Sequence, residues 1–195
     1  MSAIAEHAHF FRMFLTEPNV VGAIVPSSEA LAIEMVKRAN VTRARTIVEV
    51  GGGTGAITGV ITREAPREAM IISIEINTTF ARILSSRFGN VHVITDSAER
   101  LSVYLQAAAR TSADSVISGL PWASFDDHLQ RRLLGVMGNA LAATGTFVTF
   151  AYWHASMLPA ARRFREHLEK MFSDVDVSPV IWRNLPPAFV YACRA

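Results

Sequence analysis

A run of glycines directly after an apolar, β-branched stretch is the clearest chemical signal in this sequence. The stretch Ile47-Val48-Glu49-Val50 leads into Gly51, Gly53 and Gly55, and helix-forming residues follow from Ala56. Glycine has no Cβ and adopts backbone torsions that other residues avoid, so such a turn lets a ligand approach the backbone closely. We therefore expect a strand, a tight turn and a helix, with a nucleotide-like ligand held at the turn.

Two ligand fingerprints fit this run. Gly51-x-Gly53-x-x-Ala56 matches the pattern of dinucleotide-binding proteins, whereas Glu49-x-Gly51-x-Gly53-x-Gly55 matches the S-adenosylmethionine loop of methyltransferases. The glycine run alone leaves both ligands open.

Two carboxylates follow later apolar stretches, where strands are expected to end. Glu75 lies about twenty residues past the glycine loop, where a carboxylate bonds the ribose hydroxyls of an adenosine in either ligand class. Asp96 ends the next expected strand, where methyltransferases use an acid to accept from the adenine amino group. Each acid has a simpler alternative as a cap of the helix that follows it. Both nevertheless fall at the carboxyl ends of parallel strands, where ligands bind.

The elements expected around these residues alternate between strand and helix. This alternation predicts an α/β domain with a Rossmann-like, mostly parallel sheet of seven strands. The predicted strands cover residues 46–50, 70–76, 91–95, 114–118 and 146–152, and residues 175–182 and 188–193 predict a closing antiparallel hairpin. The predicted helices cover residues 56–64, 78–88, 98–109, 126–141 and 158–172. Two more helices are expected ahead of the first strand, one over residues 3–15 and one from a cap at Ser27 or Ser28 to about Ala39.

The composition excludes several classes of protein. A chain of 195 residues with 50% hydrophobic and 18% charged residues can bury a full core and is unlike disordered proteins. Its single cysteine, Cys193, excludes an intramolecular disulfide, and the net charge of +2 gives no argument for nucleic acid. Because no secretion signal or membrane-spanning stretch is apparent, we expect a cytoplasmic protein.

Four segments together resemble the bacterial phospholipid N-methyltransferases, which convert phosphatidylethanolamine stepwise to phosphatidylcholine. They are residues 22–28, the loop from Glu49 to Gly55, Ser118-Gly119-Leu120-Pro121-Trp122, and residues 182–188 with Trp-Arg-Asn-Leu-Pro-Pro-Ala. The resemblance implies a class I methyltransferase fold, S-adenosyl-L-methionine as methyl donor, S-adenosyl-L-homocysteine as product, and no metal. It also implies that residues 1–40 form a helical lid that contacts the membrane, over a core of residues 41–195.

The fingerprints and the resemblance place the cofactor at the glycine loop and the strand ends. The expected cofactor-binding residues are Ser27, Ser28, Glu49, Gly51, Gly53, Gly55, Glu75, Asp96, Ser118 and Leu120.

The acceptor amine must lose a proton before it attacks the methyl group in line. Tyr152 and His154, just past the fifth strand, are candidates to assist directly or through water, although His154 also fits an exposed loop. Trp122, Tyr152 and Trp153 stand at strand ends, where aromatic faces could bind a quaternary ammonium product or simply pack the core.

The expected partners are an aminophospholipid and the bilayer surface, with the protein peripheral on the inner face of the membrane. The head group would contact Trp153, Arg183 and Asn184, since the latter two lie at the hairpin turn and suit a lipid phosphate. Arg183 could equally be a surface arginine.

Three alternatives stay open. A ribosomal RNA adenine dimethyltransferase shares the glycine loop and a Leu-Pro dipeptide, but such enzymes have Asn before that dipeptide and Tyr or Phe after it. This chain has Gly119 and Trp122 there, and no basic tail that would favour nucleic acid. A methyltransferase of a small amine or of another aminolipid such as ornithine lipid is a second alternative. A lipid-binding protein without turnover is the third.

Overall fold

The computed structural model describes residues 27–194. The helix expected over residues 3–15 lies outside the described residues. Of the expected lid, only residues 27–40 are described.

A single seven-stranded sheet forms the centre of the described chain, in the order β3-β2-β1-β4-β5-β7-β6. The strands are β1 (Thr46–Val50), β2 (Met70–Ile74), β3 (His92–Ile94), β4 (Ala113–Ser118), β5 (Leu141–Tyr152), β6 (Asp174–Val177) and β7 (Ala188–Arg194). Strands β1 to β5 pair in parallel, and β7 runs antiparallel to both of its neighbours. The predicted α/β fold with a mostly parallel seven-stranded sheet is thus confirmed.

The sheet ends in the expected antiparallel hairpin, formed by β6 and β7. Strand β7 inserts between β5 and β6, so only this strand opposes the others. The strand expected over 175–182 ends at Val177, and a loop with one isolated bridge, Ile181 to Ala188, connects it to β7. Two prolines, Pro186 and Pro187, lie directly before β7 and cannot donate to a ladder.

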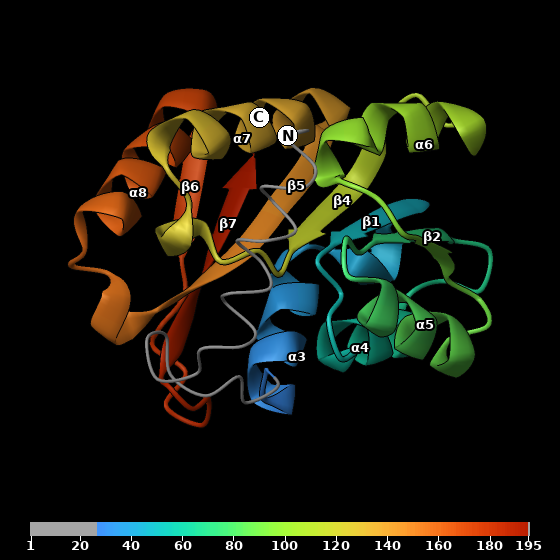
Figure 1. Cartoon of the computed structure of the whole chain (residues 1–195), viewed down its shortest axis with the longest axis horizontal. Helices are drawn as coiled ribbons and strands as arrows, with labels where there is room; N and C mark the ends of the chain where they lie inside the picture. Colours follow the sequence, from blue (N-terminus) through green and yellow to red (C-terminus); the bar gives the residue numbers. More distant parts are fainter. Residues whose placement is uncertain (1–26, 195) are drawn as a thin grey trace.

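Three helices cover each face of the sheet (Figure 1). One layer holds α3 (Glu29–Arg38), α4 (Ala56–Glu64) and α5 (Thr78–Arg87); the other holds α6 (Leu101–Ala107), α7 (Asp127–Ala140) and α8 (Pro159–Met171). Short 3-10 turns connect these elements, namely η1 (Val41–Arg43), η2 (Ala98–Arg100), η3 (Trp122–Ser124) and η4 (Trp153–Ala155). The helix expected over 98–109 therefore divides into η2 and α6.

The core consists of two apolar clusters, one on each face of the sheet. Val116 and Phe147 of the strands pack with Phe164 of α8 on one face, and Ile47 and Val148 pack with the other helical layer. Because the central strands are buried on both faces, they are almost continuously apolar in sequence.

Helix α3 belongs to this packed unit. Ser28 caps the helix, since its Oγ accepts from the Leu31 N–H at 3.2 Å, as the sequence predicts. Leu31 and Met35 are fully buried within the second cluster. The boundary expected at residue 40 thus falls inside one packed unit.

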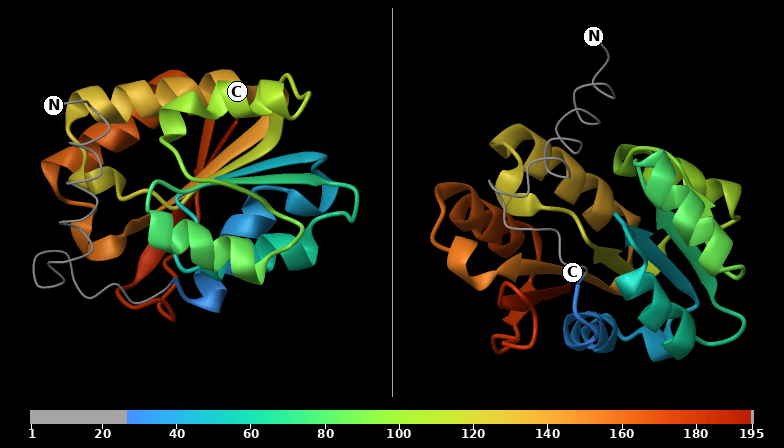
Figure 2. Two further views of the ribbon diagram at one scale, coloured as in Figure 1. Left: turned by 45° about the vertical axis from the view of Figure 1, so that its right-hand side comes forward. Right: turned by 60° about the horizontal axis from the view of Figure 1, so that its bottom comes forward.

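The carboxyl ends of the parallel strands share one edge of the sheet, and two further segments reach that edge. Tyr152, the last residue of β5, pairs with Ala188, the first residue of β7. The η4 turn after β5 and the 178–187 loop before β7 therefore lie side by side, as two views agree (Figures 1 and 2). Within residues 27–194, no helix is both long and apolar enough to cross a bilayer.

Candidate active site

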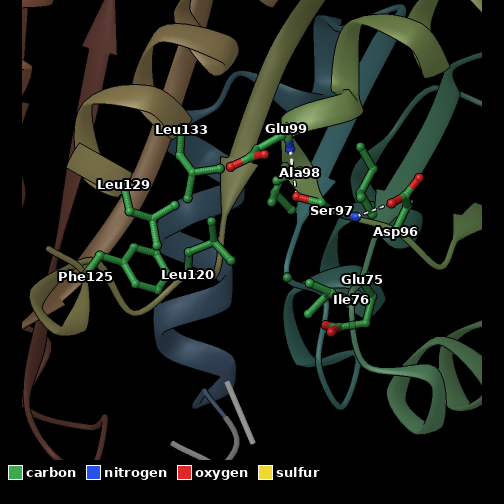
Figure 3. Close-up of a pocket in the computed structure, with 13 residues that line it drawn as sticks. Glu75, Ile76, Asp96, Ser97, Ala98, Glu99, Leu120, Phe125, Leu129 and Leu133 are labelled. Atoms are coloured by element: carbon green, nitrogen blue, oxygen red, sulfur yellow. Dashed lines mark hydrogen bonds between the residues drawn. The ribbon is translucent and has the colours of Figure 1, made fainter. Parts of the chain in front are cut away.

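A cleft opens at the carboxyl ends of β1, β2, β3 and β4, with about 570 Å³ of empty space including its mouth. The acidic side chains of Glu75, Asp96 and Glu99 line it together with a largely apolar wall (Figure 3). That wall comes from the strand ends and from α7, and consists of Val50, Ile74, Ile76, Ala98, Leu120, Phe125, Leu129 and Leu133. The cleft is thus a mainly apolar pocket with a few polar groups at one side, as is usual for small-molecule sites.

The glycine loop connects β1 to α4, and its first residue, Gly51, lines the cleft, whereas Gly53 and Gly55 are not part of the cleft wall. Gly51, Gly53 and Gly55 all have positive φ, at 77°, 54° and 88°. A Cβ placed on Gly53 would meet no atom within 4 Å, so open space lies beside this residue. The sequence prediction of a tight turn that exposes its backbone is confirmed.

Glu75 connects the loop to the cleft. Its side chain is fully buried, and its two carboxylate oxygens accept from the Gly53 N–H at 2.9 Å and from the Asn77 N–H at 2.8 Å. Burial raises the pKa of Glu75, while the backbone N–H groups oppose that rise. Glu75 is not the cap of α5, because Asn77 performs that role with its own side chain.

Asp96 lines the cleft at the end of β3. Its carboxylate accepts from the Ser97 N–H at 2.7 Å, from Arg100 Nη1 at 2.8 Å and from the Tyr104 hydroxyl. Burial alone would raise the pKa of Asp96, but the Tyr104 hydroxyl, the Ser97 amide and Arg100 outweigh burial and lower it. Asp96 is therefore ionised at neutral pH and acts as an acceptor.

Glu49, expected among the cofactor contacts, lies beneath the glycine loop and not in the cleft wall. It is buried, and its carboxylate accepts from Ser73 Oγ at 2.6 Å and from Thr58 Oγ1 at 2.8 Å. Burial raises the pKa of Glu49 to about 7. The residue thus supports the loop from below, and the expectation of a direct contact is corrected.

The three serines expected at the cofactor also lie outside the cleft wall. The Ser118 hydroxyl is buried and accepts from Trp122 Nε1 at 3.1 Å. Ser28 uses its hydroxyl to cap α3, and Ser27 is half-buried beside it. Of the residues named for the cofactor, the structure brings Gly51, Glu75, Asp96 and Leu120 together around the cleft.

Trp122 is a core residue, which corrects its expected place in the catalytic set. Its side chain is 2% exposed and stacks on Phe164 with ring centroids 4.5 Å apart. The hydrogen bond to Ser118 satisfies its indole N–H inside the core. An aromatic face enclosed in this way cannot meet a cationic head group.

The sequence reasoning missed the aromatic and aliphatic wall that does line the cleft. Phe125 follows Trp122 by one turn, and Leu129 and Leu133 follow at intervals of four on α7. Such spacing places the three side chains on one side of the chain as it enters the helix. The four-residue spacing of Phe125, Leu129 and Leu133 was therefore the feature of the sequence that could have predicted this wall.

The residues expected to handle the amine lie at the end of β5 and in η4 directly after it. Tyr152 is half-buried and its ring is 5.8 Å from that of His154, which is exposed. Burial raises the pKa of Tyr152, so its phenol is neutral at physiological pH. Neither side chain lines the cleft in this structure, and their role stays a prediction.

The expected head-group residues separate into two kinds. Trp153 and Arg183 are exposed, whereas Asn184 is buried. The Asn184 amide accepts from the Ser28 N–H at 2.9 Å and donates to the Pro186 carbonyl at 2.7 Å. Because both ends of the amide are engaged, Asn184 fixes the loop to α3, and its expected role as a phosphate ligand is corrected.

The cleft fits S-adenosylmethionine. Each Glu75 oxygen accepts one backbone N–H, which leaves acceptor capacity for ribose hydroxyls, and Asp96 offers an ionised acceptor beside an apolar wall. Gly53 presents backbone without a side chain at the loop. Among the described residues, no group of three or more His, Cys, Asp or Glu side chains is arranged to hold a metal ion.

Comparisons with known proteins agree with this geometry. No family model matches the chain. The ornithine lipid N-methyltransferase of Singulisphaera acidiphila is 35% identical over 190 residues, covering 95% of this chain and 94% of that protein.

Solved structures share the fold at lower identity. An O-methyltransferase from Bacillus cereus in complex with SAH superposes with a TM-score of 0.68 at 13% identity, over 96% of this chain and 91% of that one. A TehB-like SAM-dependent methyltransferase from Corynebacterium glutamicum has a TM-score of 0.61 at 14% identity, over 97% and 98% of the two chains.

Proposed function

This chain belongs to the family of the ornithine lipid N-methyltransferase of Singulisphaera acidiphila, and from that premise we propose that it N-methylates the terminal amine of ornithine lipid. The observation that carries the proposal is the 35% identity across 94% of that relative. The fold itself is that of class I S-adenosylmethionine-dependent methyltransferases.

The geometry of the cleft supports binding of the methyl donor. When bound, S-adenosylmethionine supplies an electrophilic methyl group on a sulfonium. Glu75 would accept from the ribose hydroxyls, Asp96 from the adenine amino group, and the backbone at Gly51 and Gly53 would lie against the rest of the molecule. The apolar wall of Phe125, Leu129 and Leu133 would exclude water from the transfer.

The protein's task toward the acceptor is to position a neutral amine in line. We expect Tyr152 to bind the amine as a neutral phenol, because its raised pKa disfavours a phenolate. The exposed His154, next to the Tyr152 ring, would then pass the proton to solvent.

Phosphatidylethanolamine is the second candidate acceptor. The Pro-Ser-Ser, Gly-Leu-Pro-Trp and Trp-Arg-Asn-Leu-Pro-Pro segments favour it, because they resemble the phospholipid N-methyltransferases. Both lipids present a primary amine near an anionic group, so the same cleft suits either head group.

A direct comparison of the two lipids tests the proposal. Purified protein is incubated with S-adenosylmethionine labelled in the methyl group and with mixed micelles of either ornithine lipid or phosphatidylethanolamine. We expect labelled, methylated ornithine lipid by mass spectrometry, and much less label with the Glu75→Gln variant. Label in phosphatidylethanolamine alone would select the second candidate, and label in neither lipid would contradict both.

A further inference from the structure

The most exposed large apolar side chains of the described residues gather in one place. Trp153, Met157, Leu158, Trp182 and Leu185 are 50–69% exposed, whereas no other exposed large hydrophobic residue of the described chain exceeds 46%. We call these five side chains the aromatic edge. Contiguous apolar groups of this kind mark sites of interaction, unlike single exposed residues.

The aromatic edge is built by two segments that hold each other. The Trp153 and Trp182 rings are in contact, with centroids 5.8 Å apart. The Trp153 N–H donates to the Pro187 carbonyl at 2.8 Å, which ties η4 to the loop before β7. Asn184 anchors the same loop to the start of α3. The two tryptophans are thus presented on a fixed support, not on a free tail.

The two segments that build the aromatic edge carry charges of one sign. Residues 153–165 and 177–194 contain no Asp or Glu, although they contain Arg162, Arg163, Arg165, Arg183 and Arg194. Arg162 and Arg183 are exposed, and neither takes part in an ion pair among the described residues. The Arg162 guanidinium instead lies 3.9 Å from the Met157 sulfur. Exposed arginines beside exposed tryptophans complement an anionic, partly apolar surface.

The position of the aromatic edge relates it to the cleft. Both segments leave the sheet at the edge where β1, β2 and β4 end, and where the cleft opens. In Figure 1 the turn after β5 and the loop before β7 lie together at the lower left, below α8. A surface that met the aromatic edge would therefore lie beside the cleft mouth.

We propose that the aromatic edge inserts into the interface of an anionic bilayer and holds the cleft mouth at the level of the lipid head groups. Tryptophan prefers this interface because its ring is apolar and its N–H is polar, and arginines near the surface are attracted to anionic lipids. Leu185, Met157 and Leu158 add apolar area that can enter the acyl boundary. This inference rests on the proposed function, because it takes the methyl acceptor to be a lipid. It further identifies the face of the protein that meets the bilayer.

Vesicle binding tests this proposal independently of methyl transfer. The full chain is sedimented with vesicles of phosphatidylglycerol and phosphatidylcholine, and compared with Trp153→Ser/Trp182→Ser. We expect the double variant to bind on the order of tenfold more weakly. The matched control is Val103→Ser/Met171→Ser, which removes two exposed apolar groups from α6 and the far end of α8 and should bind as the parent does.

Intrinsic fluorescence reports the site directly, since the chain has three tryptophans and Trp122 is buried. Vesicles should shift the emission of the parent to the blue, brominated lipids should quench it, and both effects should vanish in Trp153→Ser/Trp182→Ser. Circular dichroism and S-adenosylmethionine binding confirm that each variant is folded.

Three results would overturn the proposal. The first is unchanged vesicle binding by Trp153→Ser/Trp182→Ser. The second is tryptophan emission that vesicles do not alter, which would mean that residues 1–26 or a second copy of the chain, and not the bilayer, covers the aromatic edge. The parent and Arg162→Gln/Arg183→Gln should bind equally to purely zwitterionic vesicles. If the two also bind equally to anionic vesicles, the proposal is contradicted. Failure of the proposed function gives a different result. The protein would then bind anionic vesicles as expected but would methylate neither ornithine lipid nor phosphatidylethanolamine in micelles.

Discussion

At the scale of single residues, the two buried glutamates of this site perform different tasks. Glu75 lines the cleft and accepts from Gly53, whereas Glu49 lies beneath the loop and accepts from Ser73 and Thr58. Glu49 lies within β1 and Glu75 directly follows β2, and both were expected to touch the cofactor. Their hydrogen-bond partners, and not their positions in the sequence, distinguish the side chain that lines the cleft from the one that supports the loop.

Replacing Glu75 with glutamine should weaken S-adenosylmethionine binding by about 10–100-fold. The amide is uncharged and has only one acceptor oxygen, so it cannot accept hydrogen bonds from both backbone N–H groups as the carboxylate does. Calorimetric titration measures this loss. Glu99→Gln is the control: its carboxylate also lines the cleft but accepts from Arg132 Nε at 2.7 Å, away from the glycine loop. Equal affinities of Glu75→Gln and the parent would contradict the assigned role.

Glu49 should make the stability of the protein fall as the pH rises from about 4.5 to 7. Its pKa is about 7 in the folded protein and near 4.5 when unfolded, so over this window the folded state keeps a proton that the unfolded state has lost. The free energy of unfolding therefore decreases with pH, by on the order of 3 kcal/mol in total.

Urea unfolding of the parent and of Glu49→Gln at several pH values tests this expectation. The variant cannot titrate at this position and should show a flatter dependence across the window. A slope identical to that of the parent would assign the titration elsewhere.

At the scale of elements, the site depends on how closely the ends of β1 and β4 approach. A Cβ on Gly119 would lie 2.5 Å from the Gly51 carbonyl oxygen, which is backbone and cannot rotate away. Gly119→Ala should push the two loops apart, reduce cofactor affinity about tenfold or more and cost about 1–3 kcal/mol of stability. Gly89→Ala, where a Cβ meets no atom within 4 Å, should change neither by much. Comparable losses in the two variants would refute the close-approach argument.

The sequence predicted most elements because their signals are local. Strand β1 and helix α4 have the predicted bounds, and Ser28 caps α3 as expected. The antiparallel pair at the end of the sheet is also confirmed, but β6 ends at Val177, because the apolar residues after it form a loop that meets β7 only through the bridge of Ile181 to Ala188. Likewise, nothing near Trp122 indicated that it would stack on Phe164, because that contact exists only after α8 packs.

The site was predicted best where backbone chemistry defines it. Glycine spacing and an acid after each strand located Gly51, Glu75 and Asp96, which do line the cleft. Side chains with several possible environments could not be placed this way. Asn184 has the same chemistry whether it binds a phosphate or, as here, ties Ser28 to Pro186, and only tertiary structure distinguishes the two.

At the scale of the whole molecule, the net charge of +2 is unevenly distributed. The acid-free segments that build the aromatic edge carry the exposed Arg162 and Arg183, which form no ion pair with any residue of 27–194. Glu169 of α8 instead pairs with Arg165, and Asp174 of β6 pairs with Arg194 of β7. The protein therefore presents a basic face to its surroundings although its total charge is small. A long-range attraction to anionic lipid is expected from that face alone.

Salt should consequently weaken membrane binding without affecting the cofactor. Raising the salt concentration from about 0.05 M to about 0.5 M shortens the range of electrostatic interactions severalfold and should reduce binding to anionic vesicles by on the order of tenfold. S-adenosylmethionine affinity should hardly change, because the proposed contact is with the buried Glu75 carboxylate, where salt screens little. Sedimentation and calorimetry at both salt concentrations measure the two quantities. Arg162→Gln/Arg183→Gln should lose most of the salt dependence; if it retains all of it, the charge that attracts the bilayer lies on another face.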